Sequence, residues 1–245
     1  MFERLRDRGF EVAFTSHAEA IILHDFSELI AELEGALDQT TIPITEIIGG
    51  GGGEAKITQR LRRSLAAMQW IKHNFELKKT VDGVAKESIS HEIDHVRRTP
   101  AGVFALEIEW NNKDPFFDRD LENFKRLHAE GAISIGAIVT RGSAMQGEMR
   151  ERVERFARDR GVGDYADLEA YDAGSPTRAQ RSQIEADLQR GTDFAAAWAR
   201  KFTADKFGAA TTHWSKLQDR VHRGVGNPCP LVLIGLPPSI IDMNA

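Results

Sequence analysis

Three acidic residues on two neighbouring strands could together hold a divalent cation. Glu107 and Glu109 lie two positions apart in the apolar segment 103–110, which we expect to form a strand. Because side chains alternate across a strand, both glutamates leave it by the same face. Asp94 lies near the end of an earlier strand-like segment, 88–96. If the two strands pair as a hairpin, Asp94 and Glu107 meet at one point.

An acid at the end of one strand, followed by Glu-x-Glu on its neighbour, resembles the metal site of nucleases of the PD-(D/E)xK type. Phosphodiester hydrolysis needs a nucleophilic water and charge stabilisation at phosphorus, and Mg²⁺ bound by two carboxylates can supply both. The expected ligands are Asp94, Glu107 and the main-chain carbonyl of Ile108. Glu109 stands where the common motif has lysine, and we expect it to orient or deprotonate the attacking water.

The alternative is that these are ordinary solvent-facing acids, since acidic residues are mostly exposed. Two features favour a metal site. Like charges in the middle of an apolar stretch repel one another unless a cation lies between them. The residues that follow, Asn111, Asn112 and Lys113, are rich in hydrogen-bond donors and acceptors that can read the base edges of DNA.

Other polar residues have simpler explanations. Asp114, Asp118 and Asp120 surround Pro115 and the first turn of an expected helix. Acidic side chains there compensate the helix dipole, and we prefer this role to a second metal site. The five glycines at 49–53 precede a helix and could cradle a phosphate. No Gly-Lys-Ser/Thr follows them, so a flexible connection is the simpler interpretation.

The spacing of apolar residues predicts alternating strands and helices. A continuous apolar run at 133–140 has the length of a strand that is covered on both faces. The helix expected at 116–130 joins it to the strand at 103–110, and this order implies a right-handed parallel crossover. The other expected elements are strands at 10–14, 74–80, 88–96 and 230–237, and helices at 17–37, 54–70 and 145–160.

We therefore expect an α/β fold with a mixed central sheet flanked by helices and with helical additions, in a single domain over 1–245. Segment 161–190 is polar and is interpreted as an inserted or peripheral segment. Thr211 or Thr212 is expected to cap a helix that runs to about Arg223.

Composition excludes several classes of protein. The formal charge of −5 argues against bulk electrostatic attraction to nucleic acid, although a local basic groove would be enough for DNA binding. The single cysteine, Cys229, allows no internal disulfide and fits a reducing cytoplasm. No apolar run approaches the roughly 18 residues that a membrane span needs. The charged N-terminus lacks a signal-peptide core, so we expect a cytoplasmic protein.

Several motifs in order resemble one family. Asp94, the run from Glu107 to Asn112 and the pair Pro115-Phe116 are similar to the BglII/BstYI group of type II restriction endonucleases. In that group an aspartate precedes Glu-x-Gln or Glu-x-Glu, an aromatic residue, a polar pair and Pro-Phe. The resemblance covers roughly residues 50–145, with a looser match over 206–236.

The resemblance implies a restriction-endonuclease-like fold and a homodimer that cleaves both strands of palindromic duplex DNA with Mg²⁺. It places Asp94 and Glu107 at the metal and Glu109 at the third catalytic position. A GATC-centred site follows from the same analogy. The residues that it suggests for contacts with DNA are Asn74, Asn111, Asn112, Lys113, Arg141, Ser143, Thr211, Thr212 and His213.

Two other functions remain open from the sequence. A DNA-binding protein without catalytic activity could use the same fold and would retain duplex DNA without cutting it. A glycosidase with paired carboxylates is less favoured, because Glu107 and Glu109 leave one strand by one face and do not flank a substrate.

Overall fold

The chain folds around a six-stranded mixed sheet. The computed structural model describes residues 1–50 and 53–245, with the side chains of 85–87 excepted. The strand order is β1-β7-β6-β5-β4-β3, in which β5, β6 and β7 are parallel to one another and the remaining pairings are antiparallel. The strands are β1 (Glu11–Thr15), β3 (Ile71–Val81), β4 (Val84–Thr99), β5 (Gly102–Glu109), β6 (Ile135–Arg141) and β7 (Leu231–Leu236). The expectation of a mixed central sheet flanked by helices is confirmed.

The parallel pair β5 and β6 is joined by helix α6 (Phe116–Ala129), as the order of elements predicted. All seven residues of β6 are buried, which explains their continuous apolar run. Gly136 of β6 packs directly beneath the ring of Phe124 on α6. This contact draws the helix close to the sheet beside the strand that carries the two glutamates.

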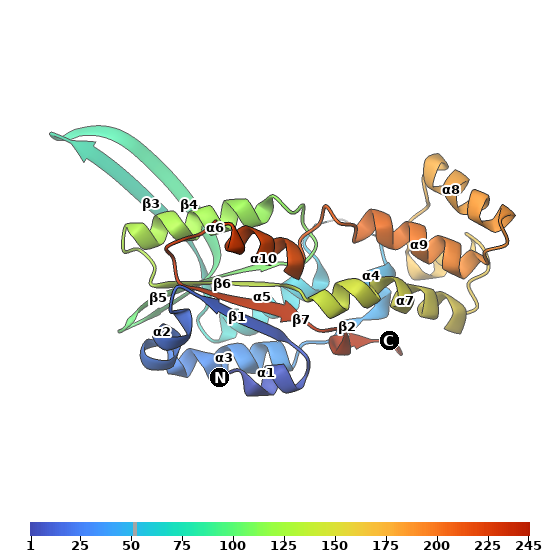
Figure 1. Ribbon diagram of the computed structural model, residues 1–245, viewed down its shortest axis with the longest axis horizontal. Coiled ribbons are helices and arrows are strands. Elements are labelled where there is room, and N and C mark those ends of the chain that lie inside the picture. The colour runs from blue at the N-terminus through green and yellow to red at the C-terminus, as the bar shows by residue number, and fades with distance from the viewer. Residues whose placement is uncertain (51–52) are drawn as a thin grey trace.

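The two faces of β5 differ in character. Phe104, Leu106 and Ile108 face a core that they share with helices α2 (Ala18–Asp25), α3 (Ser27–Asp38) and α5 (Lys56–Ala67). Ala105 faces a second core beneath α6 and α10 (Trp214–His222). Figure 1 shows α6 and α10 on one side of the sheet, and α2 and α3 on the other with α1 (Glu3–Asp7). By alternation, Glu107 and Glu109 leave β5 on the α6 side.

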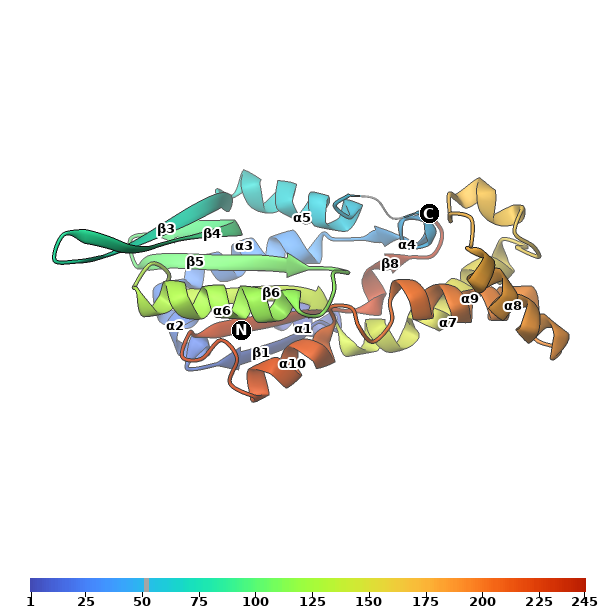
Figure 2. The same ribbon diagram turned by 90° about the horizontal axis from the view of Figure 1, so that it is seen from above.

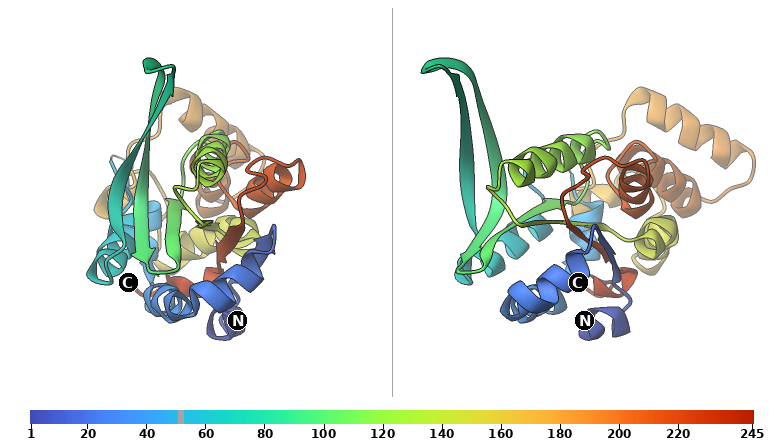
Figure 3. Two further views of the ribbon diagram at one scale, coloured as in Figure 1. Left: turned by 90° about the vertical axis from the view of Figure 1, so that its left-hand side faces the viewer. Right: turned by 60° about the vertical axis from the view of Figure 1, so that its left-hand side comes forward.

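Strands β3 and β4 form a hairpin that extends far from the body of the protein (Figures 1 and 3). Both strands are longer than the sequence predicted: β3 begins earlier, at Ile71, and β4 extends at both ends, from Val84 to Thr99. The base of the hairpin pairs with β5, from His95 opposite Leu106 to Thr99 opposite Gly102. Asp94 lies immediately beyond this paired region.

A group of helices extends at the opposite end from the hairpin (Figures 1 and 2). It consists of α7 (Ser143–Asp159), the short helix η1 (Asp167–Tyr171), α8 (Arg178–Gln189) and α9 (Phe194–Lys206). Segment 161–190 contains η1 and α8 joined by loops, and its interpretation as an inserted or peripheral segment stays a prediction. A capping box of Thr177 and Gln180 begins α8. No helix among the described residues is long and apolar enough to span a bilayer.

Short elements complete the fold and correct two predictions. Strands β2 (Ile42–Pro43) and β8 (Ile241–Asp242) form a small parallel sheet, and α4 (Ile44–Ile48) and η2 (Pro238–Ile240) adjoin it. The helix expected at 17–37 is broken at Phe26, a fully buried residue with a non-helical backbone, into α2 and α3. Helix α10 begins after His213 without a threonine cap, because Thr211 and Thr212 bond to neighbouring loops instead.

Replacing Gly136 by alanine should destabilise the fold. A Cβ there would lie 2.7 Å from Phe124 Cδ2, and that buried ring cannot move freely. We expect a loss of about 1–3 kcal/mol in the free energy of unfolding, measured with urea. Gly147→Ala is the matched control, since this exposed position in α7 has nothing within 4 Å. The control should gain up to about 1 kcal/mol from helix propensity. Equal stability of the Gly136→Ala variant and the wild type would contradict this packing.

Candidate active site

A large cleft of about 1290 Å³ opens at the carboxyl end of β5. It is lined by the base of the β3–β4 hairpin, by α6, by residues within 42–50 and 53–58, and by the end of α9. Asp94, Glu107 and Glu109 all line it. The structure therefore brings the three acidic residues predicted from sequence to one cavity.

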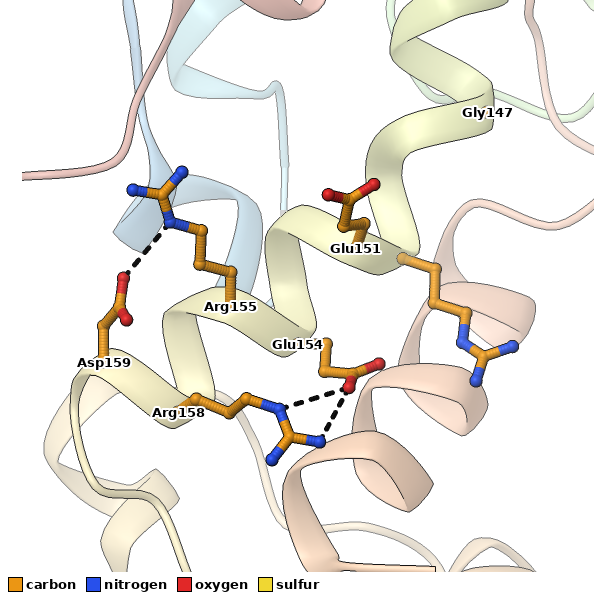
Figure 4. A pocket seen from close by; sticks show the side chains of 7 residues that line it. Gly147, Glu151, Glu154, Arg155, Arg158 and Asp159 are labelled. Atoms are coloured by element: carbon orange, nitrogen blue, oxygen red, sulfur yellow. Dashed lines mark hydrogen bonds and ion pairs between the residues drawn. The ribbon is translucent and has the colours of Figure 1, made fainter.

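A second hollow lies along α7 and has a different character. It is lined by charges that pair with one another within the helix, such as Arg155 with Asp159 at 3.3 Å and Arg158 with Glu154 at 2.8 Å (Figure 4). Exposed pairs of this kind contribute little energy and are satisfied already. None of the acidic residues of the cleft lines this hollow.

Asp94 and Glu107 meet because β4 and β5 pair as an antiparallel hairpin, as the sequence predicted. The backbone N–H of Asp94 donates a long hydrogen bond to Glu107 Oε1 at 3.4 Å. The two side chains differ in exposure: that of Asp94 is 50% exposed, whereas Glu107 is 4% exposed. Asp94 also lies 3.5 Å from the Lys72 ammonium. A cation in the cleft could therefore bind both carboxylates from the open side.

Glu109 lies beside Glu107 and is 3% exposed. Its Oε2 accepts a hydrogen bond of 2.6 Å from Asn112 Nδ2, and its Oε1 is 3.6 Å from Arg119 Nη2. One carboxylate oxygen is thus fixed by the loop that follows β5, and the other lies next to a cationic side chain.

Asp120 is a fourth member of this acidic cluster, and the dipole role expected for it is wrong. Its side chain is 1% exposed and pairs with Arg119 at 2.8 Å. Helical spacing from Phe117 and Phe124 turns it towards β5, and this spacing is the sequence signal that could have found it. The other two aspartates of that set, Asp114 and Asp118, pair instead with Arg220 at 3.3 and 2.8 Å.

Burial makes this cluster electrostatically costly. It raises the pKa of Glu107 well above the ordinary value, with further contributions from the charges of Asp120 and Asp94. It raises the pKa of Glu109 to about 8, and Asp120 adds to this effect. The pKa of Asp120 is raised by burial as well. Among the described residues, no donor contacts Asp120 Oδ2, and a hydrogen bond between the two carboxyls helps to raise the pKa of Glu109. Two carboxyl oxygens, which both accept hydrogen bonds when ionised, need a shared proton or a cation when they lie in contact.

The donor set fits a hard divalent cation. Carboxylate and carbonyl oxygens are the ligands that Mg²⁺ prefers, and Mg²⁺ usually keeps several waters. Asp94, Glu107 and the carbonyl of Ile108, which also lines the cleft, are oxygen donors. Among the described residues, no three His, Cys, Asp or Glu side chains converge closely enough to form a complete metal cage. A site of two carboxylates, one carbonyl and waters does not require such a cage.

Two of the residues expected to contact DNA lie in the loop after β5, and both form hydrogen bonds within the protein. Asn111 Nδ2 donates to the carbonyl of Lys206 at 3.0 Å, and Asn112 holds Glu109 as described above. Both line the cleft. Lys113 is exposed, and its backbone forms an isolated antiparallel β-bridge with Thr211. Asn111 and Asn112 therefore position the loop and the glutamate as well as facing the cavity.

Arg141 is completely buried, which does not support the expected contact with DNA. Its guanidinium donates to the carbonyls of Trp110 and Thr212 and to the Thr211 hydroxyl. Burial lowers its pKa to about 9. These bonds fasten the loop after β5 to the loop before α10. The buried residues Thr212 and His213 belong to the same junction.

Ser143 and Asn74 lie outside the cleft lining. Ser143 is exposed at the start of α7, and its backbone N–H and hydroxyl both bond to the carboxylate of Glu11. Asn74 is exposed on β3, and its Oδ1 accepts a hydrogen bond of 2.6 Å from Ser90, which does line the cleft. Of these two, Asn74 is the closer to a surface that DNA in the cleft would reach.

A mixed α/β sheet with a carboxylate cluster at the end of a central strand is the architecture of a restriction endonuclease. The family described as "Restriction endonuclease BglII/BglIII" matches residues 10–236 of the 245. The chain therefore belongs to this family, whose members are type II site-specific deoxyribonucleases that cleave DNA at specific sequences. No curated protein was found to match the chain. The family match extends well beyond the segments 50–145 and 206–236 on which the sequence resemblance rested.

Without metal, the protein should lose stability as pH rises from about 4.5 to about 8. The pKa of Glu109 is raised in the folded state, so the folded protein binds this proton more tightly than the unfolded chain. The free energy of unfolding then falls with pH inside this window, by at most about 1.4 kcal/mol per pH unit for one carboxyl. Urea unfolding in EDTA across this range measures the slope. Glu109→Gln should reduce this slope, because Glu107 and Asp120 still have raised pKa values in the variant. Equal slopes for variant and wild type would contradict the assignment.

Proposed function

We propose that the protein hydrolyses DNA with Mg²⁺, using Asp94, Glu107 and the carbonyl of Ile108 as ligands. The observation that carries this proposal is the meeting of Asp94 and Glu107 in a cleft that Glu109 also lines, with the buried carboxyl of Asp120 beside them. When bound, the cation would supply charge stabilisation at phosphorus and a more acidic water. The protein residues hold these oxygens in place on two paired strands.

Glu109 is suited to orient and deprotonate the attacking water. Asn112 fixes its Oε2, which leaves Oε1 on the side of Arg119 and the cleft. A pKa of about 8 in the metal-free site makes this carboxyl a better proton acceptor than an ordinary glutamate. Glu109 follows the proposed ligands Glu107 and Ile108 on the same strand, which is consistent with a role in activating water beside the metal.

The proposed substrate is palindromic duplex DNA bound by a homodimer, with both strands cut. Two-fold symmetry of the protein would match two-fold symmetry of the site, so that each subunit reads one half. Asn111, Asn112, Lys113 and Asn74 are the proposed contacts with bases or phosphates. A GATC-centred site remains the proposal from family analogy. The net charge of −5 makes the basic residues around the cleft important for binding.

Asp94→Ala and Glu107→Ala should each lower the cleavage rate by at least about 10³-fold, because each removes a proposed metal ligand and several kcal/mol of transition-state stabilisation. Cleavage of a defined duplex is measured with Mg²⁺ and with EDTA, which should abolish it. Glu76→Ala is the control, since this exposed acid on the same hairpin does not line the cleft. Full activity of either Asp94→Ala or Glu107→Ala would refute the ligand assignment.

Fragments from a DNA of known sequence should end at one recurrent palindrome, with both strands cut symmetrically. Mapping the fragment ends identifies the palindrome and tests whether GATC forms its centre. Light scattering should show a dimer at the concentrations used for cleavage. Cuts at random positions would contradict sequence-specific cleavage, and symmetric cuts by a protein that stays monomeric on DNA would contradict the dimer.

A further inference from the structure

Arg119 of α6 lies between the acidic cluster and the open cleft. Its side chain is 55% exposed and lines the cavity. Its Nε donates a hydrogen bond to Asp120 Oδ1 at 2.9 Å, and its Nη2 forms ion pairs with the same oxygen at 2.8 Å and with Glu109 Oε1 at 3.6 Å. The guanidinium carbon lies 4.4 Å from the centre of the Phe116 ring. Two protein groups therefore fix this cation beside the carboxylate proposed to activate water.

We propose that Arg119 is a further catalytic residue that contacts the phosphate being cleaved. The inference rests on the proposed function, because it assumes that the phosphate lies next to Glu109. An arginine is always protonated and its planar guanidinium can donate two parallel hydrogen bonds to phosphate oxygens. Its exposed side faces the cavity in which that phosphate would lie.

Three of the other basic residues that line the cleft pair away from Glu109. Arg62 pairs with Glu54 at 2.9 Å, Lys72 with Glu92 at 2.6 Å and with Asp94 at 3.5 Å, and Lys206 with the carbonyls of Ile47 and Gly49 at 2.8 and 2.6 Å. Arg119 differs from these three because its partners are Glu109, the carboxylate proposed to activate water, and Asp120 beside it. It is thus the cation best placed to meet charge that develops at the reacting phosphorus.

The chemistry needs such a cation at this place. A bond forms between the water oxygen and phosphorus while the bond from phosphorus to the leaving oxygen breaks. The water proton passes to Glu109, and the leaving oxygen takes a proton from solvent. The non-bridging oxygens carry the negative charge throughout, and preorganised donors beside them lower the barrier. A glutamate carries no positive charge in either protonation state, so β5 itself supplies no cation at this position.

Asp120 acts in this proposal as a positioning residue. Its carboxylate is 1% exposed and is carried by a helix whose neighbouring residues Phe117 and Leu121 are fully buried. Such an anchor fixes the guanidinium before DNA binds, which reduces the entropy lost in the transition state. The other possible role of Arg119 is structural, namely to neutralise the charge of Asp120. The two roles predict different results once Asp120 has been made neutral.

Arg119→Met keeps the aliphatic stem and removes the charge. We expect the single-turnover cleavage rate with Mg²⁺ to fall by about 10²–10³-fold, the usual effect of losing one donor to the transition state. Affinity for the same duplex, measured with Ca²⁺ in place of Mg²⁺, should fall by less than about tenfold, since the contact strengthens in the transition state. Arg126→Met is the control: it is 48% exposed on the same helix and pairs with Glu122 at 3.3 Å. The control should cleave within about twofold of wild type.

The decisive comparison is made in the Asp120→Asn background. If Arg119 contacts the phosphate, adding Arg119→Met should still lower the rate by at least about tenfold in that background. No further loss there would show that Arg119 only neutralises Asp120, and would overturn the proposal. Thermal unfolding of each variant identifies any loss due to misfolding. A wild-type protein that fails to cleave refutes the proposed function. A wild type that cleaves no faster than Arg119→Met overturns only this inference.

Discussion

The crowding of four carboxylates at the end of β5 is the constraint on which the rest of the structure depends. Glu107, Glu109 and Asp120 are each less than 5% exposed, and Asp94 closes the set from the cleft side. Buried like charges raise one another's pKa and cannot all ionise without a compensating cation. A fold that retains such a group must hold it against its own repulsion. The neighbouring elements of the fold supply that restraint.

Two features of the structure hold the acidic residues in place against their mutual repulsion. The first is β5 itself, which is paired on both sides and whose apolar alternate residues face a separate core. The second is the junction between the loop after β5 and the loop before α10, centred on the buried guanidinium of Arg141. Through this junction Asn112 is fixed at its backbone by Thr212 and reaches Glu109 with its side chain. Asn112, Arg141 and Thr212, which the sequence suggested as contacts with DNA, therefore hold the acidic residues in place through hydrogen bonds within the protein.

The sequence predicted the parts of the site that depend on periodicity and missed those that depend on packing between distant segments. The two-residue spacing of Glu107 and Glu109 fixed their shared face, and the paired strands brought in Asp94. Asp120 was assigned to the helix terminus, because acidic residues near a helix start usually serve the dipole. Only the packing of α6 on β5 shows that it turns inwards. Arg141 and the threonines before α10 were assigned to DNA, although their partners lie about 30 and 70–100 residues away in sequence.

The ligands proposed for the metal come from elements of unequal rigidity. Glu107 lies on a strand that is buried on both faces, whereas Asp94 lies on the exposed hairpin strand, where a lysine already competes for it. Exposed strands with few apolar contacts open more readily than core strands. The geometry of Glu107 is thus set by the core, and that of Asp94 by the local pairing of β4 with β5.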